Sequence, residues 1–282
     1  MSKIAVIGIV GNSVFLEVDK FHEGGETVEA KSVHFELGGK GFNQAVAAAR
    51  YGAEVSFLAA VGSDSFGAVR SFLENESIKA YLSKKEQQTA FASIVTDKIG
   101  SNHVTVYQGA QLSGNDVSSF ENEIKGADIL LLNNEVTEEV NLRAIEIAKR
   151  YGVRVVLNPA PARQTSQYIL ENVDLFTPNE HETLGIEEKE NVVITVGKRG
   201  CIIKSENNKS IPAVSVARVV DTTGAGDTFN GVLAASLAEG NTLTEAVTAA
   251  NIASSIGVTR RYAVSSIPTK KEIEEIMKCK RD

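Results

Sequence analysis

Short, continuous apolar segments that alternate with helical segments constrain the fold of this chain more than any other feature. Residues 4–10, 54–61, 129–132 and 154–157 are apolar almost throughout, and helical patterns such as residues 138–151 follow them. A strand that is apolar on both faces is typical of a parallel sheet covered by helices on each side. The sequence therefore predicts a three-layer α/β/α fold with a central, mostly parallel, Rossmann-like sheet.

Two segments, residues 12–36 and 87–108, interrupt this alternation. Each contains two short β-prone stretches around a turn-rich centre, which predicts a hairpin outside the main sheet. Paired with each other, the hairpins would form a small projecting sheet that is suited to act as a lid over a polar ligand. We therefore expect residues 1–282 to form one domain with these two lid segments inserted in it. The unpaired edges of the projecting sheet favour a homodimer that forms through this lid.

Composition and charge exclude several classes of partner. The 282 residues are 43% hydrophobic, which is enough for a large core, and the formal net charge is −7. This charge offers no footprint for nucleic acid or an anionic membrane. No apolar segment reaches transmembrane length, the N-terminus has no signal-peptide pattern, and the two cysteines lack metal-ligand spacing. We expect a cytoplasmic protein with reduced thiols.

Polar residues and glycines recur where the predicted strands end. Because the carboxyl ends of parallel strands meet at one edge of a sheet, where open α/β sheets bind ligands, a shared cleft is expected there. These residues are Asn12, Glu135, Asn158, Asn179, Gly197 and Asp227.

Two glycine-rich stretches precede helical segments, Gly38–Asn43 before residues 44–51 and Asp221–Gly231 before residues 232–238. Small residues allow backbone N–H groups to approach an anion, and the first turn of a helix offers unpaired donors at the positive end of its dipole. Asp227 fits two interpretations at this point. Its carboxylate would either cap the helix or act as a general base.

The two stretches, with Asn158–Arg163, Thr177–Glu182 and Thr195–Gly200 between them in the same order, resemble the signatures of the ribokinase-like family of sugar and nucleoside kinases. The resemblance is greatest to the ribokinase branch and covers nearly the whole chain. It implies an ATP-dependent phosphotransferase that acts on a hydroxyl of a small sugar. Asp227 would be the general base, and an anion hole would stabilise the transferring phosphoryl group through Gly224, Ala225, Gly226 and Asp227.

The resemblance also implies the ligand contacts. The matching sugar positions are Gly39, Lys40, Asn43, Glu135 and Asp227, to which Asn12 is added if the loop shifts by one residue. The matching ATP positions are Asn179, Thr195, Gly197, Lys198, Gly200, Gly226 and Asn251. Glu182 would hold Mg²⁺ through water. A monovalent cation, K⁺ in this family, would bind at Asp221, Thr223, Gly257, Arg260 and Ser266, beside Tyr262, where the branch prefers glycine.

Two features depart from the ribokinase branch. Ribokinases carry Asn-x-Asp after the first strand to hold the hydroxyls of the sugar, whereas this chain has Gly11 and Ser13 at those positions. The acceptor is therefore open among ribose, another pentose, a hexose, a deoxysugar and a nucleoside. Ribokinases also have a further helix where this chain has only residues 186–191. We expect one short helix, about residues 179–185, to make that crossover.

Three other functions compete with a sugar kinase. A nucleoside kinase of the same family differs only in its acceptor. A sugar or nucleotide sensor without catalysis would keep the fold, although the complete Gly224–Asp227 sequence argues against it. The stretch Gly8–Gly11 suggests a dinucleotide-dependent oxidoreductase, but the third glycine of that fingerprint and the acidic residue downstream are absent.

Overall fold

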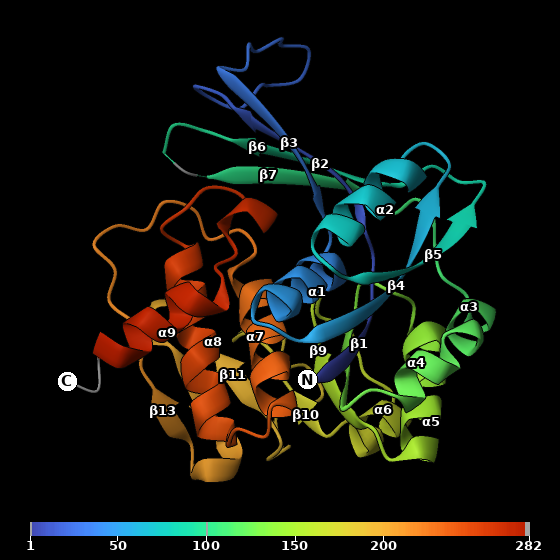
Figure 1. Ribbon diagram of the computed structural model, residues 1–282. Helices are drawn as coiled ribbons and strands as arrows, with labels where there is room; N and C mark the ends of the chain where they lie inside the picture. Colours follow the sequence, from blue (N-terminus) through green and yellow to red (C-terminus); the bar gives the residue numbers. More distant parts are fainter. Residues whose placement is uncertain (1, 100, 280–282) are drawn as a thin grey trace.

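The predicted central sheet is present in the computed structural model, which describes residues 2–99 and 101–279 (Figure 1). Six strands pair in parallel in the order β10-β9-β8-β1-β4-β5. Their bounds are Lys3–Ile7 (β1), Glu54–Gly62 (β4), Lys79–Lys85 (β5), Ile129–Asn133 (β8), Arg154–Asn158 (β9) and Leu175–Phe176 (β10). The apolar segments of the sequence thus form the middle of the sheet, as expected.

Helices cover both faces of this sheet and complete the three layers. Alternate residues of β1 point to opposite faces, so Ile4 and Val6 join one apolar core while Ala5 and Ile7 join the other. The first core is covered by α1 (Lys40–Arg50), α2 (Phe66–Asn75), α7 (Ala225–Ala238), α8 (Leu243–Gly257) and α9 (Lys270–Cys279). The second is covered by α3 (Gly114–Ser119), α4 (Glu121–Lys125), α5 (Glu138–Tyr151) and α6 (Gln167–Asn172).

A second, antiparallel sheet continues from β10. It contains β11 (Val193–Thr195), β12 (Cys201–Ile203) and β13 (Lys209–Ile211). Parallel bridges from Phe176 to Val192 and from Asn179 to Thr195 join it to the end of the main sheet. Strand β13 ends at Ile211, because the next residue, Pro212, has no backbone N–H to donate to a neighbouring strand.

The two predicted hairpins are present, and they pair into one projecting sheet of four strands in the order β3-β2-β6-β7. Their bounds are Gly11–Glu17 (β2), Ser32–Gly38 (β3), Ala90–Thr96 (β6) and Asn102–Tyr107 (β7). Parallel pairing of β2 with β6 joins the hairpins. In Figure 1 this projecting sheet stands away from the main body, above the loop that precedes α9.

The helix expected near residues 179–185 is wrong, because this segment consists of turns. Asn179 bridges to Thr195, and its side-chain oxygen accepts a hydrogen bond from the His181 backbone N–H at 2.8 Å. Glu182 in turn accepts from the Asn179 N–H at 3.0 Å, and Gly185 has a φ of +80°. Local side-chain bonds of this kind compete with a helix and produce a turn instead.

Glycines bring α1 unusually close to its neighbours. A β-carbon on Gly41 would lie 2.6 Å from the Cα of Gly8, at the end of β1. A β-carbon on Gly231 of α7 would lie 2.3 Å from the carbonyl oxygen of Gln44 and 2.6 Å from the β-carbon of Ala47. Real β-carbons do not approach other atoms so closely, so α1 can occupy this position only if Gly41 and Gly231 stay glycine.

This contact yields a prediction for stability. Gly231→Ala forces α7 away from α1 and should destabilise the fold by about 1–3 kcal/mol, the usual cost of overpacking a core. Gly67→Ala in α2 is the matched control, since nothing lies within 4 Å of its added carbon. It should be neutral or stabilise by about 0.5–1 kcal/mol. Urea unfolding of both variants measures the difference, and equal stabilities would contradict the prediction.

Candidate active site

Asp227 lies in the first turn of α7, where its carboxylate is held by side chains of α1. The Asn43 amide donates to one carboxylate oxygen at 2.9 Å, and the Gln44 amide lies 3.3 Å from the other. The N-cap of α7 is Gly224, with a φ of +74°, and Asp227 is only 7% exposed. The capping interpretation is therefore wrong, and the orientation of the carboxylate is determined by α1.

The predicted anion hole lies directly before this carboxylate. The Ala225 N–H donates to the Thr222 carbonyl at 3.2 Å, and the Thr228 N–H donates to the Gly224 carbonyl at 2.8 Å. Gly226 and Asp227 fall between these two, in the turn where a helix has no carbonyl of its own for its N–H groups. Their N–H groups and the positive end of the α7 dipole suit an anion.

Lys40 brings positive charge to this site. Its backbone N–H donates to Glu135 at 2.6 Å, which ties the start of α1 to the turn after β8. The negative charge of Asp227 raises the pKa of the Lys40 side chain, and the charges of Glu135 and Glu182 raise it further. Burial raises the pKa of Glu135 to about 7, with the charge of Asp227 adding to the shift. Lys40 therefore stays protonated among three carboxylates.

Gln44 is a site residue that the sequence reasoning did not single out. Its amide nitrogen lies 3.3 Å from both Asp227 and Asn158, and so connects α1, α7 and the end of β9. The side-chain oxygens of Asn43 and Gln44 are buried without a hydrogen-bond partner among the described residues. Buried amide oxygens normally have partners, so these two are free to accept from a bound hydroxyl. The only sequence signal was the position of Gln44 directly after Asn43.

The predicted ATP positions are distributed along the antiparallel sheet. Thr195 pairs with Asn179, Gly197 begins a single turn of 3₁₀ helix, Lys198 is exposed, and Gly200 has a φ of +96°. The Asn251 side chain makes two hydrogen bonds to the antiparallel sheet, since it accepts from Cys201 at 2.9 Å and donates to the Ile211 carbonyl at 3.1 Å. Asn251 thus anchors α8 to β12 and β13. Burial raises the pKa of the Cys201 thiol to about 12, so this thiol stays protonated.

The predicted monovalent-cation positions form two neighbouring groups. Asp221 accepts from the Thr223 N–H at 2.9 Å and from the Tyr262 N–H at 2.9 Å. A β-carbon on Gly257 would lie 3.8 Å from the carbonyl oxygen of Ser266. Arg260 donates to the Gly257 carbonyl through its N–H at 2.9 Å, and its guanidinium lies 3.4 Å from the Ser266 carbonyl. The expected oxygens are thus present, with a guanidinium beside them.

The altered stretch Gly11–Ser13 begins strand β2. Asn12 donates to Ser65 at 2.8 Å, which ties the base of the projecting sheet to the start of α2. A β-carbon on Gly11 would lie 2.6 Å from the Ala90 carbonyl oxygen. Ser13 is 9% exposed, and its hydroxyl lies 2.8 Å from where a Gly38 β-carbon would be. Strand β6 therefore lies so close to β2 at this point that position 11 has no space for a side chain longer than that of glycine.

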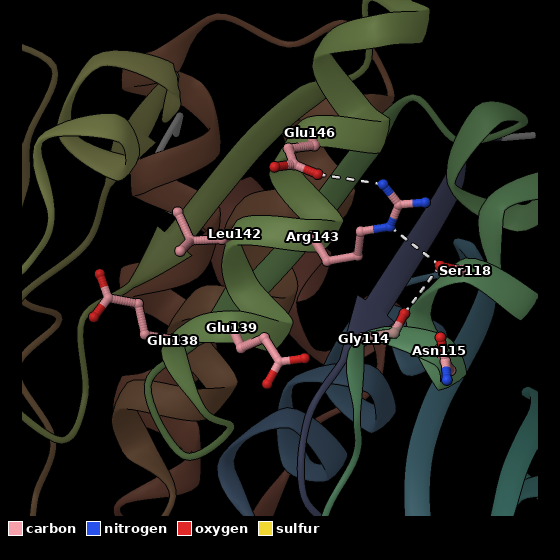
Figure 2. Close-up of a pocket in the computed structure, with 8 residues that line it drawn as sticks. All are labelled: Gly114, Asn115, Ser118, Glu138, Glu139, Leu142, Arg143 and Glu146. Carbon is pink, nitrogen blue, oxygen red and sulfur yellow. Dashed lines mark hydrogen bonds and ion pairs between the residues drawn. The ribbon is translucent and has the colours of Figure 1, made fainter.

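A surface groove of about 660 Å³ lies between α3 and α5, away from these residues (Figure 2). Arg143 crosses it and is paired with Glu146 and Ser118, so its charge is already satisfied. None of the predicted site residues lines the groove.

In the part of the chain that the structure describes, no group of three acidic, histidine or cysteine residues could hold a metal ion, and no helix is long and apolar enough to cross a membrane.

Comparison with known proteins agrees with this arrangement. Residues 1–270 match the family described as pfkB family carbohydrate kinase. The chain is 34% identical over 295 residues to the ribokinase of Lactococcus lactis, which covers 99% of this chain and 98% of the relative. Ribokinase from Thermotoga maritima superimposes with a TM-score of 0.88 at 32% identity, covering 99% of this chain and 100% of that one. Arabidopsis thaliana ribokinase, solved with ribose and ATP, gives 0.86 at 25% identity, with 99% of each chain covered.

The chain belongs to the pfkB family of carbohydrate kinases. Within that family its similarity is to ribokinases, and it is an ATP-dependent phosphotransferase that phosphorylates a sugar. The resemblance found in the sequence motifs is thereby confirmed, as is the three-layer fold.

The raised pKa of Glu135 predicts how stability depends on pH. Between pH 4.5 and about 7 the folded protein keeps a proton on Glu135 that the unfolded chain has lost, so this group's stabilising contribution is lost as pH rises through 7. Glu135→Gln cannot ionise and still offers an oxygen to Lys40. Its melting temperature should therefore match that of the unaltered protein at pH 5 and exceed it by a few degrees at pH 8.

Melting curves at the two pH values measure this difference. The exposed Glu188→Gln controls for the loss of one negative charge. A Glu135→Gln protein that loses stability relative to the unaltered protein between pH 5 and pH 8 would contradict the assignment.

Proposed function

We propose that Asp227 is the general base that takes the proton from a sugar hydroxyl as its oxygen attacks the γ-phosphorus of ATP. The observation that carries this proposal is the buried Asp227 carboxylate, held by Asn43 and Gln44 at the start of α7. A base acts only within hydrogen-bond reach of the proton it takes, so its orientation matters as much as its basicity. The acceptor hydroxyl is placed beside Asp227, within reach of the free oxygens of Asn43 and Gln44.

The N–H groups of Gly226 and Asp227, with the α7 dipole, stabilise charge on the transferring phosphoryl group. Phosphoryl transfer is mainly alignment and charge stabilisation, for which oriented dipoles in a closed site are well suited. Lys40, which stays protonated beside Asp227 and Glu135, contacts the acceptor from the other side together with Gly39. The nucleotide extends from this point along Asn179, Thr195, Gly197, Lys198 and Gly200.

Magnesium fits this site only as a partner of the ATP phosphates. Because the described residues hold no cluster of metal ligands, and Mg²⁺ keeps several waters, one carboxylate acting through water is sufficient. That carboxylate is Glu182, whose charge reaches Lys40. When bound, Mg²⁺ neutralises charge on the phosphates. Potassium would bind the oxygens of Asp221, Thr223, Gly257 and Ser266, and the Arg260 guanidinium beside them is already paired with Glu272.

The acceptor is a small sugar, and the residues that bind its hydroxyls differ from those that bind ribose in the ribokinase branch. Gly11 and Ser13 offer no carboxylate, and space at Gly11 is closed by Ala90. Recognition then depends on Asn43, Glu135 and the base of the projecting sheet. A nucleoside kinase is the second candidate, because a site that lacks one anchoring carboxylate also accommodates a sugar carrying a base.

The projecting sheet acts as the lid of a single kinase domain, and we propose that it also forms the contact of a homodimer in the cytoplasm. Large apolar side chains are exposed on three of its four strands, and the outer edges of β3 and β7 are free to pair within the described residues. These side chains are Val33, Phe35, Phe91, Val104, Val106 and Tyr107. A mass in light scattering equal to one chain would contradict the dimer.

Asp227→Asn tests the proposed base. Asparagine has the shape of aspartate but cannot accept the proton, so turnover should fall by a factor on the order of 10²–10⁴ while ATP affinity stays within about twofold. Glu239→Gln, which removes a carboxylate at the other end of α7, is the control and should keep normal turnover. Near-normal turnover in Asp227→Asn would remove Asp227 from this role.

An acceptor panel tests the substrate and the cation together. D-ribose, 2-deoxy-D-ribose, D-xylose, D-fructose, adenosine and inosine are offered with Mg²⁺ and ATP, and ADP release is followed in KCl and in NaCl. We expect turnover of a free sugar, faster in KCl. Turnover of nucleosides alone would favour the nucleoside kinase, equal rates in both salts would exclude activation by potassium, and binding without turnover would favour a sensor.

A further inference from the structure

Glu36 of strand β3 joins the projecting sheet to a loop 227 residues later in the chain. Its carboxylate accepts from the backbone N–H of Ala263 at 2.8 Å, and from those of Val264 and Ser265 at 3.3 Å. The Ser265 hydroxyl donates to it at 3.1 Å. The Glu36 side chain is only 8% exposed. A buried carboxylate with four donors from one loop is a strong contact, because hydrogen bonds to a charged group are about twice as strong as neutral ones.

A second contact from the same strand reaches the same loop. The rings of His34 and Tyr262 are stacked, with centroids 3.7 Å apart and an angle of 8° between them, and Phe15 of β2 meets Tyr262 edge-on at 5.2 Å. Tyr262 has a φ of +71°, a conformation that costs a non-glycine residue energy. The loop therefore holds this ring against the sheet in spite of backbone strain.

From this loop the contacts continue to the start of α7. The Tyr262 N–H donates to Asp221 at 2.9 Å, and Asp221 in turn accepts from the Thr223 N–H at 2.9 Å. A β-carbon on Gly224 would lie 3.1 Å from the Cα and Cβ of Ala263, so these two backbones are in contact. Residues 262–265 thus contact the projecting sheet on one side and the stretch Asp221–Gly224 on the other.

We propose that Glu36 is a positioning residue for phosphoryl transfer, because it transmits the position of the projecting sheet through residues 262–265 to the anion hole at Gly224. Glu36 itself touches no reacting atom. Its carboxylate keeps Ala263 against Gly224, and so keeps the N–H groups of Gly226 and Asp227 aimed at the phosphoryl group. The inference rests on the proposed function of that anion hole. Through this contact, closure of the projecting sheet over the acceptor would also bring the N–H groups of the anion hole into position for phosphoryl transfer.

Glu36→Gln is the test variant, since it keeps the size of the side chain but replaces one acceptor oxygen with a donor that faces the loop N–H groups. Glu26→Gln is the matched control, because Glu26 lies in the same hairpin and its carboxylate accepts from the Lys20 side chain and the Glu23 N–H, both within that turn. We expect kcat for the sugar identified in the panel, D-ribose being the first probe, to fall about tenfold in Glu36→Gln. The dissociation constant for ADP should stay within about twofold.

Two measurements separate positioning from a general loss of folding. Calorimetric titration with ADP counts intact sites, and kcat is expressed per intact site. The variant Tyr262→Gly, which relieves the strained φ but removes the ring, should also lower kcat, and the double variant should lose little more than Glu36→Gln alone because both act through one loop. A kcat per site within twofold of normal in Glu36→Gln, or fully additive losses in the double variant, would overturn the proposal.

Failure of the proposed function gives a different result. If the unaltered protein phosphorylates no compound in the panel, the acceptor assignment fails, and the inference is tested by hydrolysis of ATP with water as the acceptor. ATP and water then give ADP and phosphate at the same anion hole. Glu36→Gln should slow this reaction about tenfold per ADP site, while Glu26→Gln leaves it unchanged. An unchanged rate of hydrolysis in Glu36→Gln would overturn the inference.

Discussion

The close contact of α1 with the end of β1 and with α7 determines the geometry of the candidate active site. It exists because Gly8, Gly41 and Gly231 leave no β-carbon between the backbones. Through this contact Asn43 and Gln44 reach Asp227 on a helix almost two hundred residues away, at 2.9 and 3.3 Å. A methyl group on one of these glycines would push the helices apart, and the distances from Asn43 and Gln44 to Asp227 would then exceed those of a hydrogen bond.

Electrostatics at this site depends on few charges. The whole chain is acidic, with a formal net charge of −7, yet its ligand ATP is an anion. Attraction must therefore be local, and the structure supplies it through protonated Lys40 and the positive end of α7. Burial and the charge of Asp227 raise the pKa of Glu135 to about 7, and the positive charge of Lys40 partly offsets this rise. A sugar that displaces water here would strengthen each of these interactions.

Much of the fold could be predicted, because apolar strands and glycine-rich turns are local patterns, and the roles proposed for the candidate site residues stay predictions. Helices α1 and α7 begin four and seven residues before the predicted positions, since their first turns contain the poor helix former glycine, at Gly41 and Gly226. Strand β5, with three lysines, was missed because it is an edge strand. The bonds of Gln44 and Glu36 join distant segments, and no local pattern encodes such pairs. The turn at residues 179–185 was missed because its side-chain bonds were not foreseen.

The packing of Gly11 against Ala90 limits how acceptor preference can change in this lineage. An asparagine or aspartate at position 11 would collide with the backbone of β6. A single substitution there would therefore displace or unfold the projecting sheet before it could change the specificity for the acceptor. The neighbouring strand must move first. Substrate choice and strand spacing are therefore inherited together, and directed evolution of this enzyme should vary β2 and β6 in the same library.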